Sequence, residues 1–160
     1  TIDLAFNVNV QALYRFLDQG LKAGAKKFIY ASTLSVYRDI FGNLPLTEDH
    51  APNAWEPYGL TKRLGEQTLL AAGQQFPAAT LVGLRLLQPK SEADWVNPIR
   101  SKYRHNETHT GPQDTRDLFL AALALDKPGV HLVQTSGDLT GQAVPNDRAT
   151  ALLGWQPQGR

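Results

Sequence analysis

The sequence contains no cysteine among its 160 residues, which excludes disulfide bonds, thiolate catalysis and cysteine-ligated metal sites. Methionine is also absent and the first residue is Thr1, so we expect either a part of a longer protein or a sequence that skips residues. No apolar run approaches the roughly 18 residues of a membrane span, and the opening residues lack the basic and apolar regions of a secretion signal. We therefore expect a cytoplasmic protein with no membrane partner.

An excess of charge of one sign is lacking as well. The formal net charge is +1, and 19% of the residues are charged. A chain this close to neutrality has no strong field to attract nucleic acid or an anionic membrane, so we expect no nucleic-acid partner. The hydrophobic share of 42% is sufficient for one globular domain with a core of its own.

The hydrophobic pattern alternates between helical and strand-like segments. Helices are predicted over residues 9–23, 57–73, 114–126 and 146–153, and strands over 26–33, 79–89 and 130–136. This alternation is typical of a parallel sheet with helices packed on its faces. In such sheets ligands bind beyond the carboxyl ends of the strands, so the strand exits over 31–37 and 88–92 are candidate walls of a site. In the second helix, we expect the apolar face to consist of Leu60, Leu64 and Ala71.

The helix predicted over 57–73 begins with a possible catalytic pair. Tyr58 and Lys62 are four residues apart, which places them on one face of the helix. A free phenol has a pKa of about 10, and a neighbouring ammonium lowers that pKa by favouring the phenolate. Such a tyrosine can exchange a proton with a substrate hydroxyl or carbonyl, and Glu66, one turn further along, could hold the lysine. The alternative is an ordinary helix start, with a half-buried tyrosine and a solvated lysine.

The hydroxyl of Thr33 is a further candidate for the site. This residue ends the strand predicted over 26–33 and precedes Tyr58 by 25 residues (58 − 33). At a strand exit, the hydroxyl can bond the same substrate oxygen that the tyrosine attacks. The alternative is that Thr33 makes a local hydrogen bond to the backbone, as short hydroxyl side chains commonly do.

Three stretches, FIYASTLSVY, PLTEDHAPNAWEPYGLTKRLGE and LRLLQP, together resemble the extended short-chain dehydrogenases/reductases of the NAD-dependent epimerase/dehydratase family. The spacing fits without gaps from Asn9 to about Pro89, and ALLGWQPQ is similar to the family's tail. The resemblance implies an α/β fold: the second half of a Rossmann-like doubly wound parallel sheet, with a small C-terminal substrate lobe over about 90–112 and 137–160. It also implies an N-terminal glycine-rich half, which this sequence does not contain.

The resemblance further implies the role of each site residue. Tyr58 would be the general acid/base, Lys62 would bind the nicotinamide ribose and tune the tyrosine, and Thr33 would orient the substrate. The residues implied at the cofactor, NAD or NADP, are Asn9, Ala31, Ser32, Lys62, Leu87, Gln88 and Pro89. Those implied at the substrate are Thr33, Leu34, Ser35 and Glu56. The implied chemistry is hydride transfer with a sugar, sugar-acid or polyol-like substrate, in a homodimer formed through the Tyr58 helix.

Several departures from the family pattern bear on the substrate. Gln88 stands where asparagine is common, and Glu56 stands where a small residue often precedes Pro-Tyr. The stretch THTGPQDTRDL lacks the arginine and histidine that nucleotide-sugar enzymes often carry ahead of their V-x-D motif, and only Arg116 and Asp117 remain there. This departure favours a smaller substrate. A nucleotide-sugar epimerase or dehydratase, a non-catalytic NAD(P)-binding sensor and an inactive subdomain remain alternatives. The zinc motif requires a glutamate directly after the first of its two histidines, and the segment over 105–109 has Asn106 at that place, so we predict a polar loop there and no metal site.

Overall fold

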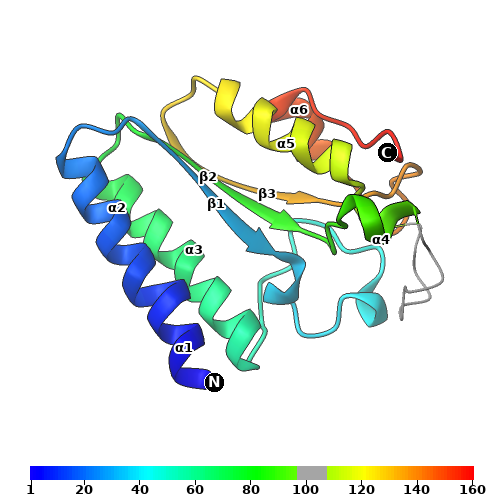
Figure 1. Cartoon of the computed structure of the whole chain (residues 1–160), viewed down its shortest axis with the longest axis horizontal. Coiled ribbons are helices and arrows are strands. Elements are labelled where there is room, and N and C mark those ends of the chain that lie inside the picture. The colour runs from blue at the N-terminus through cyan, green and yellow to red at the C-terminus, as the bar shows by residue number, and fades with distance from the viewer. Residues whose placement is uncertain (97–107) are drawn as a thin grey trace.

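The computed structural model of the chain describes residues 1–96 and 108–160 (Figure 1). The strands are β1 (Lys27–Thr33), β2 (Thr80–Leu86) and β3 (Gly129–Thr135). The helices are α1 (Ile2–Phe6), α2 (Leu13–Lys22), α3 (Pro57–Gln75), α4 (Glu92–Val96), α5 (Pro112–Ala124) and α6 (Asp147–Leu153). Most of the histidine pattern over 105–109, and about half of the lobe segment over 90–112, lie outside the described residues.

The three strands form one parallel sheet in the order β1, β2, β3. Their register aligns Thr33 of β1 with Leu86 of β2, and Leu86 with Thr135 of β3. All three carboxyl ends therefore lie at the same edge of the sheet, which is where open α/β sheets bind ligands. The predicted α/β fold with a parallel sheet is confirmed, and each predicted strand agrees with the structure to within three residues.

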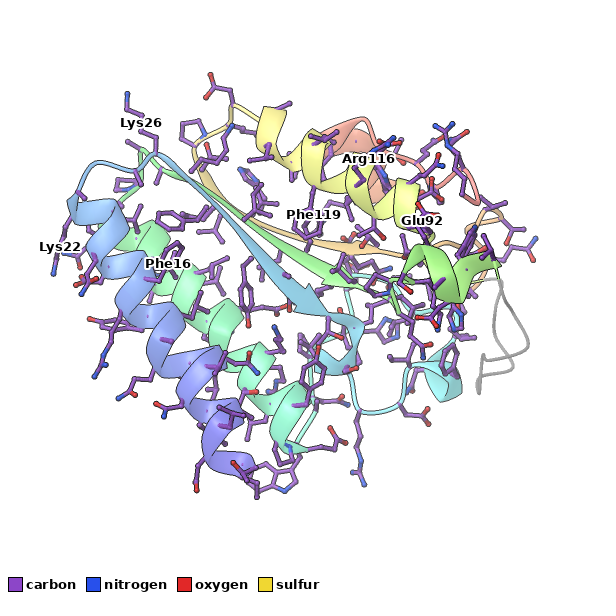
Figure 2. All side chains as sticks on the ribbon, in the orientation of Figure 1. Phe16, Lys22, Lys26, Glu92, Arg116 and Phe119 are labelled. Atoms are coloured by element: carbon purple, nitrogen blue, oxygen red, sulfur yellow. The ribbon has the colours of Figure 1, made fainter. Side chains whose placement is uncertain are left out.

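Helices cover both faces of the sheet, as Figure 1 shows, with α1, α2 and α3 on one side and α5 and α6 on the other. The first face packs Leu17, Leu21 and Leu69 against Tyr30 and Leu81. The second face packs α5 and α6 against residues of all three strands, and its buried members are Val82, Leu84, Leu118, Ala122, Val133, Ala149 and Trp155. Figure 2 shows Phe16 and Phe119 on opposite sides of the sheet, on α2 and α5.

The first helix begins earlier than predicted, at Ile2 rather than near residue 9, and it passes through a π-helical stretch over Asn7–Ala12. Short π-helical turns within an α-helix are frequent at functional sites. Gly24 has a φ of 94° and follows the last turn of α2, in the left-handed backbone that commonly ends a helix at glycine. No helix within the described ranges has the length and apolar content of a membrane span.

The buried face of α3 differs from the predicted one. Its buried residues are Gly59, Thr61, Gly65, Glu66 and Leu69, whereas Leu64 and Ala71 line a groove between α2 and α3. The physical reason is close approach, because a Cβ at position 65 would overlap the hydroxyl of Tyr30. Apolar periodicity therefore identified the face that meets α2, not the face that meets the sheet.

A third hydrophobic cluster lies beyond the carboxyl ends of the strands and supports the loops there. Its buried members are Leu34, Val36, Tyr37, Leu46, Leu87 and Val144. Gln134 of β3 ties two of these loops together, because its amide nitrogen donates to the carbonyl oxygens of Leu46 and Pro145. The loops that border the strand exits therefore rest on a packed base.

Asp138 organises the loop that follows β3. Its carboxylate accepts hydrogen bonds from the backbone N–H groups of Thr140, Gly141, Ala143 and Val144, and from the hydroxyl of Thr140. Burial alone would raise the pKa of Asp138, but these hydrogen bonds outweigh burial and hold the pKa below its usual 3.8. The carboxylate form is therefore the one that the folded loop binds.

We expect Asp138→Asn to lower the free energy of unfolding at pH 7 by about 1–3 kcal/mol, since it leaves the buried N–H of Val144 and the part-buried N–H groups of the same loop without a strong acceptor. Because the folded-state pKa lies below that of the unfolded chain, this stabilisation is present above the unfolded-state pKa and is lost as pH falls through the folded-state pKa. Urea unfolding at pH 7 and at pH 3 measures both effects. The exposed Asp126→Asn is the control, and equal stability of the two variants at pH 7 would contradict the assignment.

Candidate active site

Tyr58 lies in the first turn of α3, and its side chain is 52% exposed. Pro57 occupies the first helical position, where its missing N–H has no partner to lose. The ammonium of Lys62, one turn further on, lies 5.9 Å from the centroid of the Tyr58 ring. The predicted pair therefore shares one face of the helix, with the phenol open to a ligand.

The ammonium of Lys62 is fixed against β1. Its Nζ donates to the carbonyl oxygen of Ala31 at 2.9 Å and lies 5.1 Å from the ring centroid of Tyr30. Two aromatic rings thus flank the cation, a contact that attracts it electrostatically. Burial lowers the pKa of Lys62, because the charged form loses water.

Glu66 does not hold Lys62, so that prediction is wrong. Its carboxylate accepts two hydrogen bonds from Arg85 of β2, at 2.9 and 2.8 Å, and a third from the hydroxyl of Ser32 at 2.7 Å. Arg85 also donates to the hydroxyl of Tyr37 at 2.6 Å. This buried network ties α3 to β1, to β2 and to the loop after β1, and it supplies the charged, hydrogen-bonded partner that a buried carboxylate needs.

Sequence reasoning missed Arg85 and Tyr37. A signal was present, since Arg85 is the one charged residue in the apolar stretch ATLVGLRLL, and a buried arginine requires a carboxylate nearby. Both residues lie inside the molecule, with Arg85 6% and Tyr37 5% exposed. Their role is to hold the walls of the site.

Thr33 ends β1 and caps the 3-10 turn Leu34–Val36. Its Oγ1 accepts a hydrogen bond from the backbone N–H of Ser35 at 3.1 Å, which is the local bond considered as the alternative role. The bond uses the oxygen as acceptor, so the hydroxyl proton remains available for a substrate oxygen. The local and the catalytic roles are therefore compatible in one side chain.

Gly59 permits the close approach of α3 to this turn. A Cβ at position 59 would overlap the carbonyl oxygen of Ser35 and press against the side chain of Ala54. The absent side chain allows the first turn of the helix, with Tyr58, to rest directly on the exit of β1.

A pocket of about 420 Å³ opens beside Tyr58. Its lining comes from the loop after β1 and from the start of α3: Ser35, Tyr37, Arg38, Asp39, Ile40, Phe41, Glu56, Tyr58 and Gly59. Two predicted substrate residues, Ser35 and Glu56, are among them. Leu34 is fully buried in the third cluster, so its side chain belongs to the core, and its contact with a substrate stays a prediction for its backbone alone.

The residues predicted at the cofactor are placed in different ways. The amide of Asn9 donates to the hydroxyl of Thr61, which in turn donates to the carbonyl oxygen of Tyr58, so Asn9 supports the start of α3. Ala31 is exposed on β1, whereas Ser32 is buried with Glu66.

At the exit of β2, Leu87 is a core residue whose carbonyl oxygen accepts bonds from the backbone and hydroxyl of Thr110. Gln88 has a φ of 41°, a left-handed backbone that asparagine adopts more readily than glutamine. Pro89 is exposed. Position 88, where this sequence has glutamine and the family commonly has asparagine, is therefore the one described non-glycine position with a positive φ.

Comparison with known sequences places this arrangement in context. Residues 2–105 match the sequence model of the NAD dependent epimerase/dehydratase family. Among curated proteins, an uncharacterized protein of Sinorhizobium fredii is 36% identical over 64 residues, which are 40% of this chain and 16% of that protein.

Solved structures share the fold. A short-chain dehydrogenase/reductase superfamily protein from Agrobacterium tumefaciens, with bound NAD, has a TM-score of 0.78 and 21% identity, over 98% of this chain and 70% of that chain. UDP-glucuronic acid 4-epimerase from Bacillus cereus, in complex with NAD, has a TM-score of 0.74 and 20% identity, over 94% of this chain and 60% of that chain. The Rossmann-like fold is confirmed, and the chain spans only part of the length of the proteins it matches.

Proposed function

Because this chain belongs to the NAD-dependent epimerase/dehydratase family, we propose that it carries the proton-transfer part of an NAD(P)-dependent oxidoreductase or epimerase acting on a sugar, sugar-acid or polyol-like substrate. The observation that carries the proposal is the position of Lys62. Its ammonium lies 5.9 Å from the ring of Tyr58 and 2.9 Å from the carbonyl oxygen of Ala31. A cation and an exposed phenol thus meet beside a strand exit, where ligands of open α/β sheets bind.

In the proposed reaction, Tyr58 is the general acid/base. Its phenolic oxygen takes a proton from a substrate hydroxyl during oxidation and returns one to the carbonyl oxygen during reduction. The ammonium of Lys62 stabilises the phenolate, and partial burial strengthens that attraction by excluding water. Thr33 donates its hydroxyl proton to the same substrate oxygen. A bound nicotinamide would supply the hydride acceptor or donor.

The residues at the edge of β1 fit the nicotinamide end of NAD or NADP. An ammonium has three N–H donors, and Lys62 uses one on Ala31, which leaves two for ribose hydroxyls. The exposed methyl of Ala31 leaves room beside them. The sequence contains no G-x-x-G-x-x-G run, so the proposed contacts are confined to that end. They are Asn9, Ala31, Ser32, Lys62, Gln88 and Pro89.

The named activities of similar structures guide the choice of substrates. One is a UDP-glucuronic acid 4-epimerase and another a mutated uronate dehydrogenase. Both free sugar acids and nucleotide sugars therefore belong in a substrate panel, together with neutral sugars and polyols. The departures noted in THTGPQDTRDL favour the smaller members.

The test is NAD(P)-dependent turnover of the full-length protein over that panel, followed by the change of absorbance of the reduced nicotinamide. We expect one substrate class to support turnover, and we expect Lys62→Met to reduce kcat/KM by about 10²-fold or more, because the phenolate loses its cation. Lys26→Met, at the opposite end of the sheet (Figure 2), is the matched control. Cofactor binding without turnover of any substrate would instead support a sensor.

We also propose a homodimer through α2 and α3. A groove of about 520 Å³ runs between these helices, and its lining includes Val10, Tyr14, Leu64 and Ala71. Tyr14 is 59% exposed there, which a second copy would cover. Analytical ultracentrifugation of the full-length protein at micromolar concentration tests this, and a monomer would contradict it.

A further inference from the structure

Arg38 lines the pocket beside Tyr58 and has no function in the scheme above. Among the nine described residues around that pocket, it carries the only positive charge. We propose that Arg38 is a specificity-determining residue that binds the carboxylate of a sugar-acid substrate. The inference rests on the proposed function, because it assigns the substrate of that same site.

The backbone at Arg38 is held through its own N–H and through the residue that precedes it. Its N–H donates to Oδ1 of Asn53 at 2.7 Å, and the preceding Tyr37 is held by Arg85 through its hydroxyl at 2.6 Å. The guanidinium itself is unpaired, since within the described ranges no carboxylate lies at ion-pair distance from it. A side chain anchored at its base, with five free N–H donors at its end, is prepared for an acidic ligand.

Of the two carboxylates that line the pocket, one already has a hydrogen-bond partner in the described chain. Asp39 accepts a hydrogen bond from the N–H of Gly42 at 2.8 Å. Glu56 precedes the first turn of α3, where the positive end of the helix dipole favours a negative charge. The carboxylate of Glu56 makes no capping hydrogen bond, so Arg38 is set apart by its sign: it is the one cation among the described residues of the pocket.

The chemistry of the pocket favours a carboxylate over a phosphate. A guanidinium matches a planar carboxylate with two parallel hydrogen bonds. A phosphate dianion would bring a second negative charge close to Asp39 and Glu56, and the repulsion rises with each added charge. Ser35 and Tyr58, which both carry a hydroxyl group, line the same space, and this suits the remaining hydroxyl groups of a sugar acid.

The test compares a hexuronate, the hexose of the same ring stereochemistry and its 6-phosphate, all with the NAD-loaded full-length protein. Binding is measured by isothermal titration and by saturation-transfer NMR. We expect the hexuronate to bind tightest, and Arg38→Gln to weaken it roughly 10- to 100-fold while leaving the hexose unchanged. Arg38→Lys should recover part of the loss, because a point charge replaces the two-pronged contact. Arg116→Gln removes the same charge from an exposed side chain of α5 (Figure 2) and should change nothing.

Each outcome decides the inference separately from the proposed function. Equal binding of hexuronate and hexose, a preference for the 6-phosphate, or equal weakening of all three ligands by Arg38→Gln would overturn it. Hexuronate binding that depends on Arg38 without hydride transfer would uphold the inference and reject the proposed function. If a neutral sugar is turned over and Arg38→Gln does not change the rate, the proposed function is upheld and the inference is rejected. Thermal unfolding checks that each variant is folded.

Discussion

Replacing Tyr58 by phenylalanine is expected to reduce kcat by about 10²- to 10⁴-fold, the range that a positioned general acid/base contributes. The change removes one oxygen atom from a side chain that is half exposed, so packing and stability should be unaffected. Cofactor affinity should also persist, because the proposed ribose contacts come from Lys62 and not from the phenol. Steady-state turnover of the full-length protein, together with fluorescence titration of NAD, measures both.

Tyr30→Phe is the matched control for this variant. Tyr30 presents its ring to the same ammonium, at 5.1 Å, but its hydroxyl is buried and has no hydrogen-bond partner among the described residues. Removing that hydroxyl keeps the ring contact and should leave kcat unchanged. A Tyr58→Phe variant with wild-type kcat, or a Tyr30→Phe variant with a larger loss of kcat than Tyr58→Phe, would contradict the assignment of Tyr58 as the acid/base.

Breaking the buried pair between Glu66 and Arg85 is expected to have the largest effect on stability. Both side chains are almost wholly inside the protein, 3% and 8% exposed. Arg85→Met would leave the carboxylate of Glu66 without its charged partner, and losses of about 3–5 kcal/mol in the free energy of unfolding are typical of that change. Urea unfolding followed by circular dichroism gives the value.

A double-mutant cycle separates the pair from the individual side chains. The double variant Glu66→Leu, Arg85→Met leaves no unpaired charge, so we expect it to be more stable than either single variant. Lys22→Met serves as the comparison, because Lys22 pairs with Asp18 on the exposed surface of α2 (Figure 2) and such pairs contribute little. Losses that simply add in the double variant would show that the two side chains do not act as a pair.

Much of the fold was predictable because it depends on local patterns. Apolar strands separated by helices lead to a parallel sheet whatever the identity of each residue. Gly24 marks the end of α2 and Pro57 marks the start of α3, in both cases through backbone geometry alone. The position of Tyr58 and Lys62 on one face of α3 follows in the same way from four-residue spacing.

The parts that could not be predicted depend on contacts between distant segments. Whether Glu66 meets Lys62 or Arg85 is decided by how α3 crosses β2, and helical spacing carries no information about that crossing. The buried face of α3 was missed because glycine and a paired glutamate form it, and neither registers as hydrophobic. Arg38 was missed because only the folded loop brings it beside Tyr58.

The close contact at Gly59 has a consequence for how this protein could be altered. Glycine within a helix costs about 1 kcal/mol relative to alanine, so procedures that fill helices with strong helix formers would replace it. The added methyl group would collide with the carbonyl oxygen of Ser35, and α3 would have to settle further from β1. The resulting protein would keep α3 as a helix, but the phenol of Tyr58 would move away from its place beside the exit of β1. Position 59 is thus a place where demands for stability and for activity conflict, although its residue has no side chain with which to touch a substrate.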